Sequence, residues 1–213
     1  PYVIIGGVVL LVFVIIAITK MPVTQTEERK NTRAIDSAKR LFKNHNYREG
    51  VLTQFFYVAA QIMCWTFIIH YAENLGIPKA VGQRYNIIAM ILFLSSRFIS
   101  TFLMKYLKPS VMLKIFAMGG MATTLGVIFI GGMTGLYCLV ATSIFMSLMF
   151  PTIYGIALKG LGDDSTLGAA GLVMAIVGGA LMPPLQGAII DLGKVAWLPA
   201  VNASFILPFI CFV

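Results

Sequence analysis

The chain has 213 residues, of which 59% are hydrophobic and only 11% are charged, and its formal net charge is +8. Soluble domains carry roughly 25% charged residues, so this composition excludes an ordinary soluble globular protein and indicates lipid as the solvent. The three cysteines, Cys64, Cys138 and Cys211, fall inside apolar segments without metal-ligand spacing, which predicts neither a disulfide framework nor a metal site.

Seven apolar segments are each long enough to cross a hydrocarbon core of ~30 Å, which requires about 20 helical residues. The expected membrane helices are 1–19, 51–72, 85–104, 110–132, 136–158, 167–190 and 197–213. We therefore expect an all-α membrane protein without a sheet, built as a six-helix bundle preceded by one extra transmembrane helix. The first segment lacks the basic start and cleavage site of a signal peptide, so we interpret it as a true span. Both chain ends fall inside apolar segments, which indicates that the last helix is truncated.

A charged segment, 20–50, connects the first expected helix to the bundle. Twelve basic residues fall on the side of this segment: Lys20, Arg29, Lys30, Arg33, Lys39, Arg40, Lys43, Arg48, Lys105, Lys108, Lys114 and Lys159. The other side has three, Lys79, Arg84 and Lys194. Because cytoplasmic loops carry the excess of Lys and Arg, 20–50 is predicted to be a basic cytoplasmic linker, and the positive charge does not indicate nucleic-acid binding. Its apolar spacing fits either an amphipathic helix at the membrane surface or a solvated connector.

A stripe of polar and aromatic residues follows one side of the second expected helix. Tyr57, Gln61 and Trp65 are spaced four residues apart. Gln61 lies near the middle of the span, where an amide is costly unless it meets a neighbouring helix or a water-filled cavity. A planar ring beside an amide suits a sugar, whose CH groups pack on the ring while its hydroxyls bond to the amide. The alternative is a glutamine that bridges two helices and a tryptophan that fills the core.

Other residues carry local predictions. Arg97 is the only charge well inside an expected span. It is expected either to extend its charged end toward the membrane surface or to pair with an acidic group at a cytoplasmic gate, and we interpret it as a gate or latch and not as a substrate contact. Pro151 and the pair Pro183–Pro184 are expected to bend or break their helices. Small residues spaced four apart predict a close helix–helix contact. These are Gly171, Ala175 and Gly179.

The sequence contains no recognisable catalytic constellation. It has two histidines, no G-x-S-x-G motif, no metal-ligand cluster and no phosphate-binding glycine loop. Every carboxylate lies in a loop or at the end of an expected span, so no general acid–base pair is expected at membrane depth. We therefore do not expect an enzyme and assign no catalytic or metal-binding residue.

Three long stretches and one dipeptide form a pattern that covers most of 41–191. The stretches are GVLTQFFYVAAQIMCWTFIIHYAENLG (50–76), FMSLMFPTIYGIALKGLG (145–162) and GLVMAIVGGALMPPLQGAIID (171–191), and the dipeptide is Arg97–Phe98. In order and spacing they resemble helices seven, ten, eleven and eight of the fucose–galactose–glucose:proton symporter family of the major facilitator superfamily. The first helix and 197–213 match that family only in hydrophobicity.

The resemblance implies a domain organisation. By analogy, 1–19 is the transmembrane helix that ends the first half of a transporter, and 20–50 is the linker between the halves. The remaining segment, 51–213, is then the second six-helix major facilitator half-bundle.

The resemblance also implies site residues. Gln61 and Trp65 fall where the family presents a polar–aromatic face to the sugar cavity, and Tyr57 belongs to the same stripe. We expect this face to point away from the neighbouring helices of this half and toward the first half. Phe150 falls where relatives carry an aromatic residue that faces the cavity, and a tyrosine there would offer a hydroxyl that Phe150 lacks.

The implied function is transport of a monosaccharide of the fucose, galactose or glucose class, coupled to proton entry by alternating access. The resemblance implies no cofactor beyond the proton as coupling ion, and it places the coupling carboxylates in the first half. The implied partners are the monosaccharide, the N-terminal six-helix half and the lipid bilayer, without nucleic acid. The implied location is the inner or plasma membrane, as a multi-pass protein. Two alternatives remain: a carrier or exporter of another small solute, and a non-transporting membrane sensor or scaffold.

Overall fold

The computed structural model describes residues 2–18, 30–195 and 198–213. The chain divides into two compact units, Pro1–Asp36 and Ser37–Val213. The first unit contains α1 (Tyr2–Ile18), a single helix that lies within the expected span 1–19. The part of the expected linker that contains Lys20 and Arg29 lies outside the described residues.

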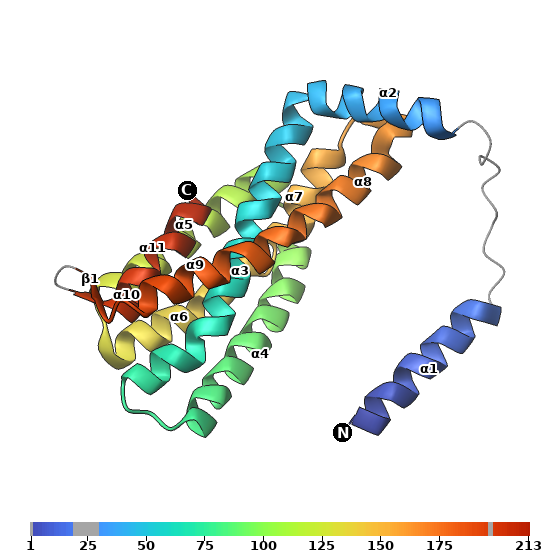
Figure 1. Ribbon diagram of the computed structural model, residues 1–213. Coiled ribbons are helices and arrows are strands. Elements are labelled where there is room, and N and C mark those ends of the chain that lie inside the picture. The colour runs from blue at the N-terminus through green and yellow to red at the C-terminus, as the bar shows by residue number, and fades with distance from the viewer. Residues whose placement is uncertain (1, 19–29, 196–197) are drawn as a thin grey trace. The chain divides into compact units, whose positions relative to one another are not determined.

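The second unit is a helical bundle (Figure 1). Its elements are the end of α2 (Lys30–Lys43), α3 (His45–Asn74), α4 (Lys79–Leu103), α5 (Pro109–Phe129), α6 (Gly132–Met146), α7 (Met149–Leu158), η1 (Gly162–Asp164), α8 (Ser165–Met174), η2 (Ala175–Val177), α9 (Gly178–Ile190), β1 (Lys194–Val195), β2 (Leu198–Pro199), α10 (Ala200–Ser204) and α11 (Ile206–Phe212). Within the described residues, five helices are long and apolar enough to cross a membrane, when α6–α7 and η1–α9 each count as one. The expected all-α membrane fold is confirmed.

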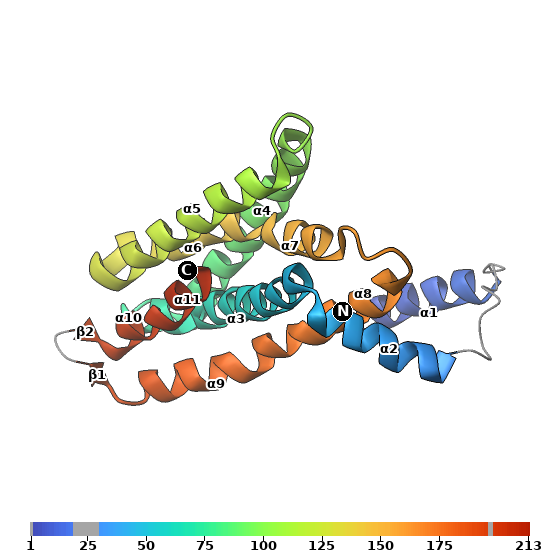
Figure 2. The ribbon, with the colours of Figure 1, turned by 90° about the horizontal axis from the view of Figure 1, so that it is seen from above.

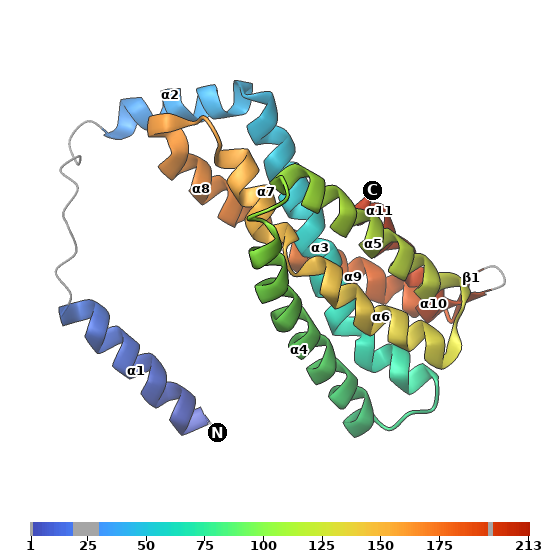
Figure 3. The same cartoon turned by 180° about the vertical axis from the view of Figure 1, so that it is seen from behind.

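The central helix of the bundle is α3. It packs against α4, α6, α7, α9 and α11, and Figure 2 shows it between α9 on one side and α5 and α6 on the other. With 30 residues at 1.5 Å rise, α3 is about 45 Å long, enough to cross a bilayer core. Figure 3 shows the α4 ribbon along the edge of the bundle, and few of the residues of this helix are buried.

Small residues bring η2 and α9 close to α3, as predicted. Gly178 lies directly against the carbonyl oxygen of Phe55, and Gly179 lies against Ile62. Farther toward the linker, Gly171 of α8 lies against the hydroxyl of Tyr47. The backbones can approach closely here because no side chain separates them.

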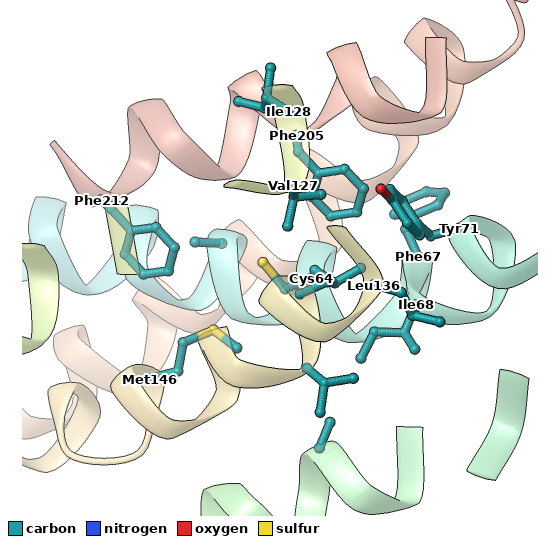
Figure 4. Close-up of a cluster of buried hydrophobic side chains, with 14 of the residues drawn as sticks. Cys64, Phe67, Ile68, Tyr71, Val127, Ile128, Leu136, Met146, Phe205 and Phe212 are labelled. Carbon is teal, nitrogen blue, oxygen red and sulfur yellow. The ribbon is translucent and has the colours of Figure 1, made fainter. Parts of the chain in front are cut away.

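Buried hydrophobic side chains around the C-terminal half of α3 form the main core (Figure 4). Tyr71 and Phe205 pack edge to face with ring centroids 6.0 Å apart. Asn202 donates hydrogen bonds to the Tyr71 hydroxyl at 3.2 Å and to the Val127 carbonyl at 2.9 Å. This buried amide joins α3, α5 and α10, so the last expected helix is anchored although it is short.

The expected helix 136–158 is broken into α6 and α7 between Ser147 and Leu148. Pro151 lies in the first turn of α7, where its missing N–H costs least. The break therefore comes just before the proline, as expected for a helix that it interrupts. By contrast, Pro183 and Pro184 lie inside α9, which continues through them, so this pair does not break its helix. A bend at this pair stays a prediction. The interruption in that segment is instead the short 3₁₀ turn η2.

The expectation of no sheet is also wrong. β1 and β2 form a two-stranded antiparallel hairpin in which Lys194 pairs with Pro199 and Val195 pairs with Leu198. Gly193 has φ of 75° and turns the chain out of α9. Pro199 then precedes the first residue of α10. The expected helix 197–213 consequently starts later and is divided into α10 and α11.

The two ends of α3 separate the linker from the segment that begins at Lys79. The described end of the linker precedes His45, whereas Lys79 follows the other end of the helix. These loops therefore lie at opposite ends of the bundle, as predicted. At the linker end, Arg40 of α2 forms a bidentate ion pair with Asp164 of η1, with N–O distances of 2.8 and 2.7 Å. This pair attaches α2 to the start of α8.

Candidate solute-contacting site

Trp65 joins three helices. Its indole N–H donates to the Ser143 hydroxyl of α6 at 3.2 Å, and its ring meets Phe93 of α4 edge to face at 5.0 Å between centroids. The expectation that Trp65 points away from the neighbouring helices of this half is wrong. An indole N–H at membrane depth needs an acceptor, and Ser143 provides one. The side chain stays half-buried, so part of it remains accessible.

Gln61 lies one turn from Trp65 toward the linker, and its hydrogen bonding differs from that of Trp65. The residue is half-buried, and its carboxamide makes no hydrogen bond with the residues that the structure describes. The oxygen and nitrogen of this carboxamide are not fully buried, so both remain accessible from the surface. The amide is therefore free to bind a ligand without breaking an existing contact.

Tyr57 is buried in the core, with only 1% of its surface exposed. Its hydroxyl donates to the Met146 carbonyl at 2.7 Å, which satisfies a group at the end of α6 that the helix break leaves without an intrahelical partner. The Tyr57 ring lies 6.4 Å from that of Phe150, in an edge arrangement. In this conformation Tyr57 supports the junction of α6 and α7 and does not face an open wall.

Phe150 is half-buried in the first turn of α7. Its ring stacks on that of Tyr154, one turn later, with centroids 6.3 Å apart and planes 13° apart. The Tyr154 hydroxyl has no hydrogen-bond partner within the described residues, and the residue is only half-buried. Sequence analysis missed Tyr154, although its spacing of four from Phe150 places both on one side of α7.

A serine cluster holds the broken segment beside the site. The Ser147 hydroxyl donates to Ser96 at 2.9 Å and approaches the Ile144 carbonyl at 2.8 Å, and Ser96 approaches the same carbonyl at 2.9 Å. Together with Tyr57, these hydroxyls surround the backbone carbonyls at the end of α6. The break is therefore stabilised by polar groups from α3 and α4 at membrane depth.

Pairing with an acidic group was one of the two arrangements expected for Arg97. Within the described residues it forms no ion pair with a carboxylate, and its guanidinium carbon lies 6.0 Å from the centroid of the Phe93 ring. Phe93 also contacts Trp65, so Arg97 is connected to the site through one aromatic ring. The predicted latch is not formed within this unit.

No family model matches the chain. Over 213 residues it is 65% identical to a protein of Haemophilus influenzae named L-fucose-proton symporter, covering 100% of this chain and 50% of the relative. The Escherichia coli protein of the same name is 34% identical over 217 aligned positions, covering 100% of this chain and 48% of the relative. A crystal structure of the Escherichia coli fucose:proton symporter matches with a TM-score of 0.85 and 33% identity, over 100% of this chain and 52% of that one. The chain thus spans about half the length of the curated relatives that it matches.

Proposed function

Because this chain belongs to the fucose–galactose–glucose:proton symporter family of the major facilitator superfamily, we propose that it is the C-terminal half of a transporter that carries a monosaccharide with a proton. In this proposal, 1–19 is the last helix of the first half, 20–50 is the linker and 51–213 is the second bundle. Fucose is the first substrate to test, since both relatives are named for it. Galactose and glucose are the other members of the class.

The free carboxamide of Gln61 is the observation that carries this proposal. It lies near mid-membrane depth beside the half-buried ring of Trp65, and it has no hydrogen-bond partner among the described residues. A sugar hydroxyl can donate to its oxygen or accept from its nitrogen, while the ring packs against CH groups. A glutamine that served only to bridge two helices would have its partner within the bundle.

Phe150 and Tyr154 extend the proposed site along α7. Because Phe150 has no hydroxyl, the hydrogen bond that a tyrosine would make at that position must come from elsewhere. Tyr154 stacks on Phe150 and keeps a hydroxyl without a partner in the described residues. We include Tyr154 as the hydroxyl donor of this aromatic pair.

Proton coupling is assigned to the other half. None of the carboxylates in the described residues lies in the middle of a membrane-length helix. A carboxylate that binds and releases a proton during transport needs a position at membrane depth. The first half, which the relatives' length implies, is therefore proposed to provide it.

Membrane placement follows from the charges. Lys39, Lys43 and Arg48 lie in or near the first turn of α3, at the linker end. Fewer basic residues lie near the opposite end of this helix. We assign the linker end to the cytoplasm and the protein to the inner or plasma membrane.

The first half and lipid are proposed to cover α4 and the η1–α9 segment. These two membrane-length helices are the least buried of those that the structure describes. Their exposed side chains are largely apolar, as at Ile91 and Phe98 of α4 and at Leu181 of α9. Arg97 lies on α4, so an acidic partner for it would come from the first half.

Proton uptake measured in vesicles tests this function. The full-length transporter should acidify the vesicle interior when fucose is added, and it should accumulate fucose against a gradient only while a proton gradient exists. Galactose and glucose serve as alternative substrates, and a non-sugar solute such as an amino acid serves as the negative control. Sugar movement without proton movement would contradict symport, and the absence of both would favour another solute or a non-transporting role.

A further inference from the structure

Gln54 is an anomaly in the core of the bundle. Its side chain is fully buried, at 0% exposure, and neither its carboxamide oxygen nor its nitrogen has a hydrogen-bond partner in the described residues. Buried polar groups in proteins are nearly always paired, so an amide with both ends unpaired requires an explanation. Gln54 lies seven residues before Gln61, on the same side of α3.

The neighbours of Gln54 show which way its side of α3 faces. One turn earlier, Gly50 lies against Ala157 of α7, and about one turn later Tyr57 meets the ring of Phe150. α3 and α7 are thus antiparallel along this side. Gln54 consequently faces the stretch of α7 between Phe150 and Ala157.

A hollow of about 190 Å³ lies at the linker end of the same contact. Its polar lining consists of Asn46, Glu49 and Thr53 of α3. Ile153 and Ile156 line it from α7, and Leu113 lines it from α5. Thr53 directly precedes Gln54, and Ile153 belongs to the stretch of α7 that Gln54 faces. Gln54 itself is fully buried and does not line the hollow.

α7 is a short helix with a defined break before it and a glycine turn after it. It has 10 residues, and the break at Ser147–Leu148 isolates it from α6. The carbonyls at the end of α6 are already bonded by hydroxyls of Ser147 and Tyr57, so tilting α7 does not require α6 to unwind. On its linker side, α7 ends at Leu158, and Gly160 follows the capping residue Lys159 with φ of 83°.

We propose that Gln54 is a second solute-contacting residue, used after the solute leaves Gln61, when α7 tilts from α3 and joins Gln54 to the hollow. The inference rests on the proposed transport function. The two glutamines are about 10 Å apart along α3 at 1.5 Å per residue. The ligand is a small polyhydroxylated solute, whose hydroxyls pair with the amide that has no partner in the closed arrangement. Gln61, Gln54 and the hollow then form one polar route toward the linker end.

The test replaces Gln54 by methionine in the full-length transporter. Methionine keeps the length of the side chain and removes its hydrogen-bonding groups. Gln54→Met should leave thermal stability equal or higher and fucose affinity within about twofold, whereas fucose exchange should slow at least about fivefold. Gln186→Met is the control, because Gln186 is also fully buried but only its oxygen lacks a partner in the described residues, whereas its nitrogen donates to Ser204 at 3.2 Å. That control should lose stability while its folded fraction exchanges fucose normally.

Normal exchange in a folded Gln54→Met protein would overturn the inference and leave only an unused buried amide or one paired with internal water. Gln54→Cys, with the native cysteines replaced, provides a second measurement. A membrane-permeant thiol reagent should label position 54 faster during fucose exchange than at rest, and equal labelling in the two conditions would also refute the proposal. If Gln61→Ala leaves fucose binding intact as well, the proposed function fails, whereas a defect confined to Gln61→Ala removes only the role of Gln54.

Discussion

The hydroxyl of Tyr57 donates a 2.7 Å hydrogen bond to the carbonyl of Met146, at the point where α6 ends. This contact connects the most buried part of α3 to a helix break at membrane depth. The sequence suggested Tyr57 for a cavity wall, but its hydroxyl is bonded to a backbone carbonyl of its own half.

Tyr57→Phe should destabilise the bundle by about 1 kcal/mol, since the Met146 carbonyl loses its partner in a buried site. Sugar affinity in the folded fraction should stay within about twofold. Thermal unfolding in detergent and a fucose-binding isotherm measure the two effects. Tyr106→Phe is the control, because Tyr106 is 75% exposed and its hydroxyl makes no hydrogen bond with the described residues. A large loss of affinity with unchanged stability would instead assign Tyr57 to the sugar.

Gln61→Ala should weaken fucose binding at least about fivefold, which corresponds to about 1 kcal/mol for one lost hydrogen bond. Folding should change little, because the amide has no partner among the described residues. Binding and melting temperature are measured on the same preparation. Normal affinity in a poorly folding variant would show that Gln61 is a packing residue.

Trp65→Ala should reduce both affinity and stability, because the ring packs on Phe93 and its N–H bonds to Ser143. The loss of affinity should be roughly 1 kcal/mol, the size of an aromatic contact. Ser143→Ala is the matched control, since it removes the indole's acceptor and leaves the ring in place. If Ser143→Ala weakens fucose binding as much as Trp65→Ala does, the ring itself has no contact with the sugar.

Tyr154→Phe should weaken fucose binding about fivefold if the hydroxyl beside Phe150 contacts the sugar. Adding Phe150→Tyr to that variant should recover part of the loss, because it returns a hydroxyl to the same stacked pair. Isotherms for the two single variants and the double variant measure this coupling. Additive effects without recovery would place the two rings in separate environments.

Gly178→Ala should destabilise the bundle by about 1–3 kcal/mol, because the added methyl group would meet the backbone carbonyl of Phe55. Gly155→Ala is a helical control with nothing within 4 Å of the new methyl group, and it should be neutral or slightly stabilising. Thermal unfolding of both variants measures the difference. Equal melting temperatures would mean that α9 can move away from α3 without cost.

The sequence alone determined the features that depend on hydrophobicity and spacing. Segment length and the scarcity of charge predict a bundle of membrane helices. A chain segment in lipid must bond its own backbone N–H and C=O groups, and a helix does so within one segment. The spacing of Gly171, Ala175 and Gly179 predicted a close helix contact, and the proline at 151 predicted an interruption near α7. The motif pattern predicted the family. Each of these follows from properties of one segment taken by itself.

Only the tertiary structure decided which polar groups have hydrogen-bond partners. Tyr57, Gln61 and Trp65 are equivalent by spacing, yet Tyr57 and Trp65 have partners on α6, whereas Gln61 has none among the described residues. The helix break provides the partner of Tyr57, because it leaves the Met146 carbonyl available, and the Ser143 side chain provides that of Trp65. Gln54 belongs to the same stripe and is buried without a partner, a state that depends on how α7 packs against α3. Hydrogen-bond partners come from other helices, so a pattern within one helix cannot specify them.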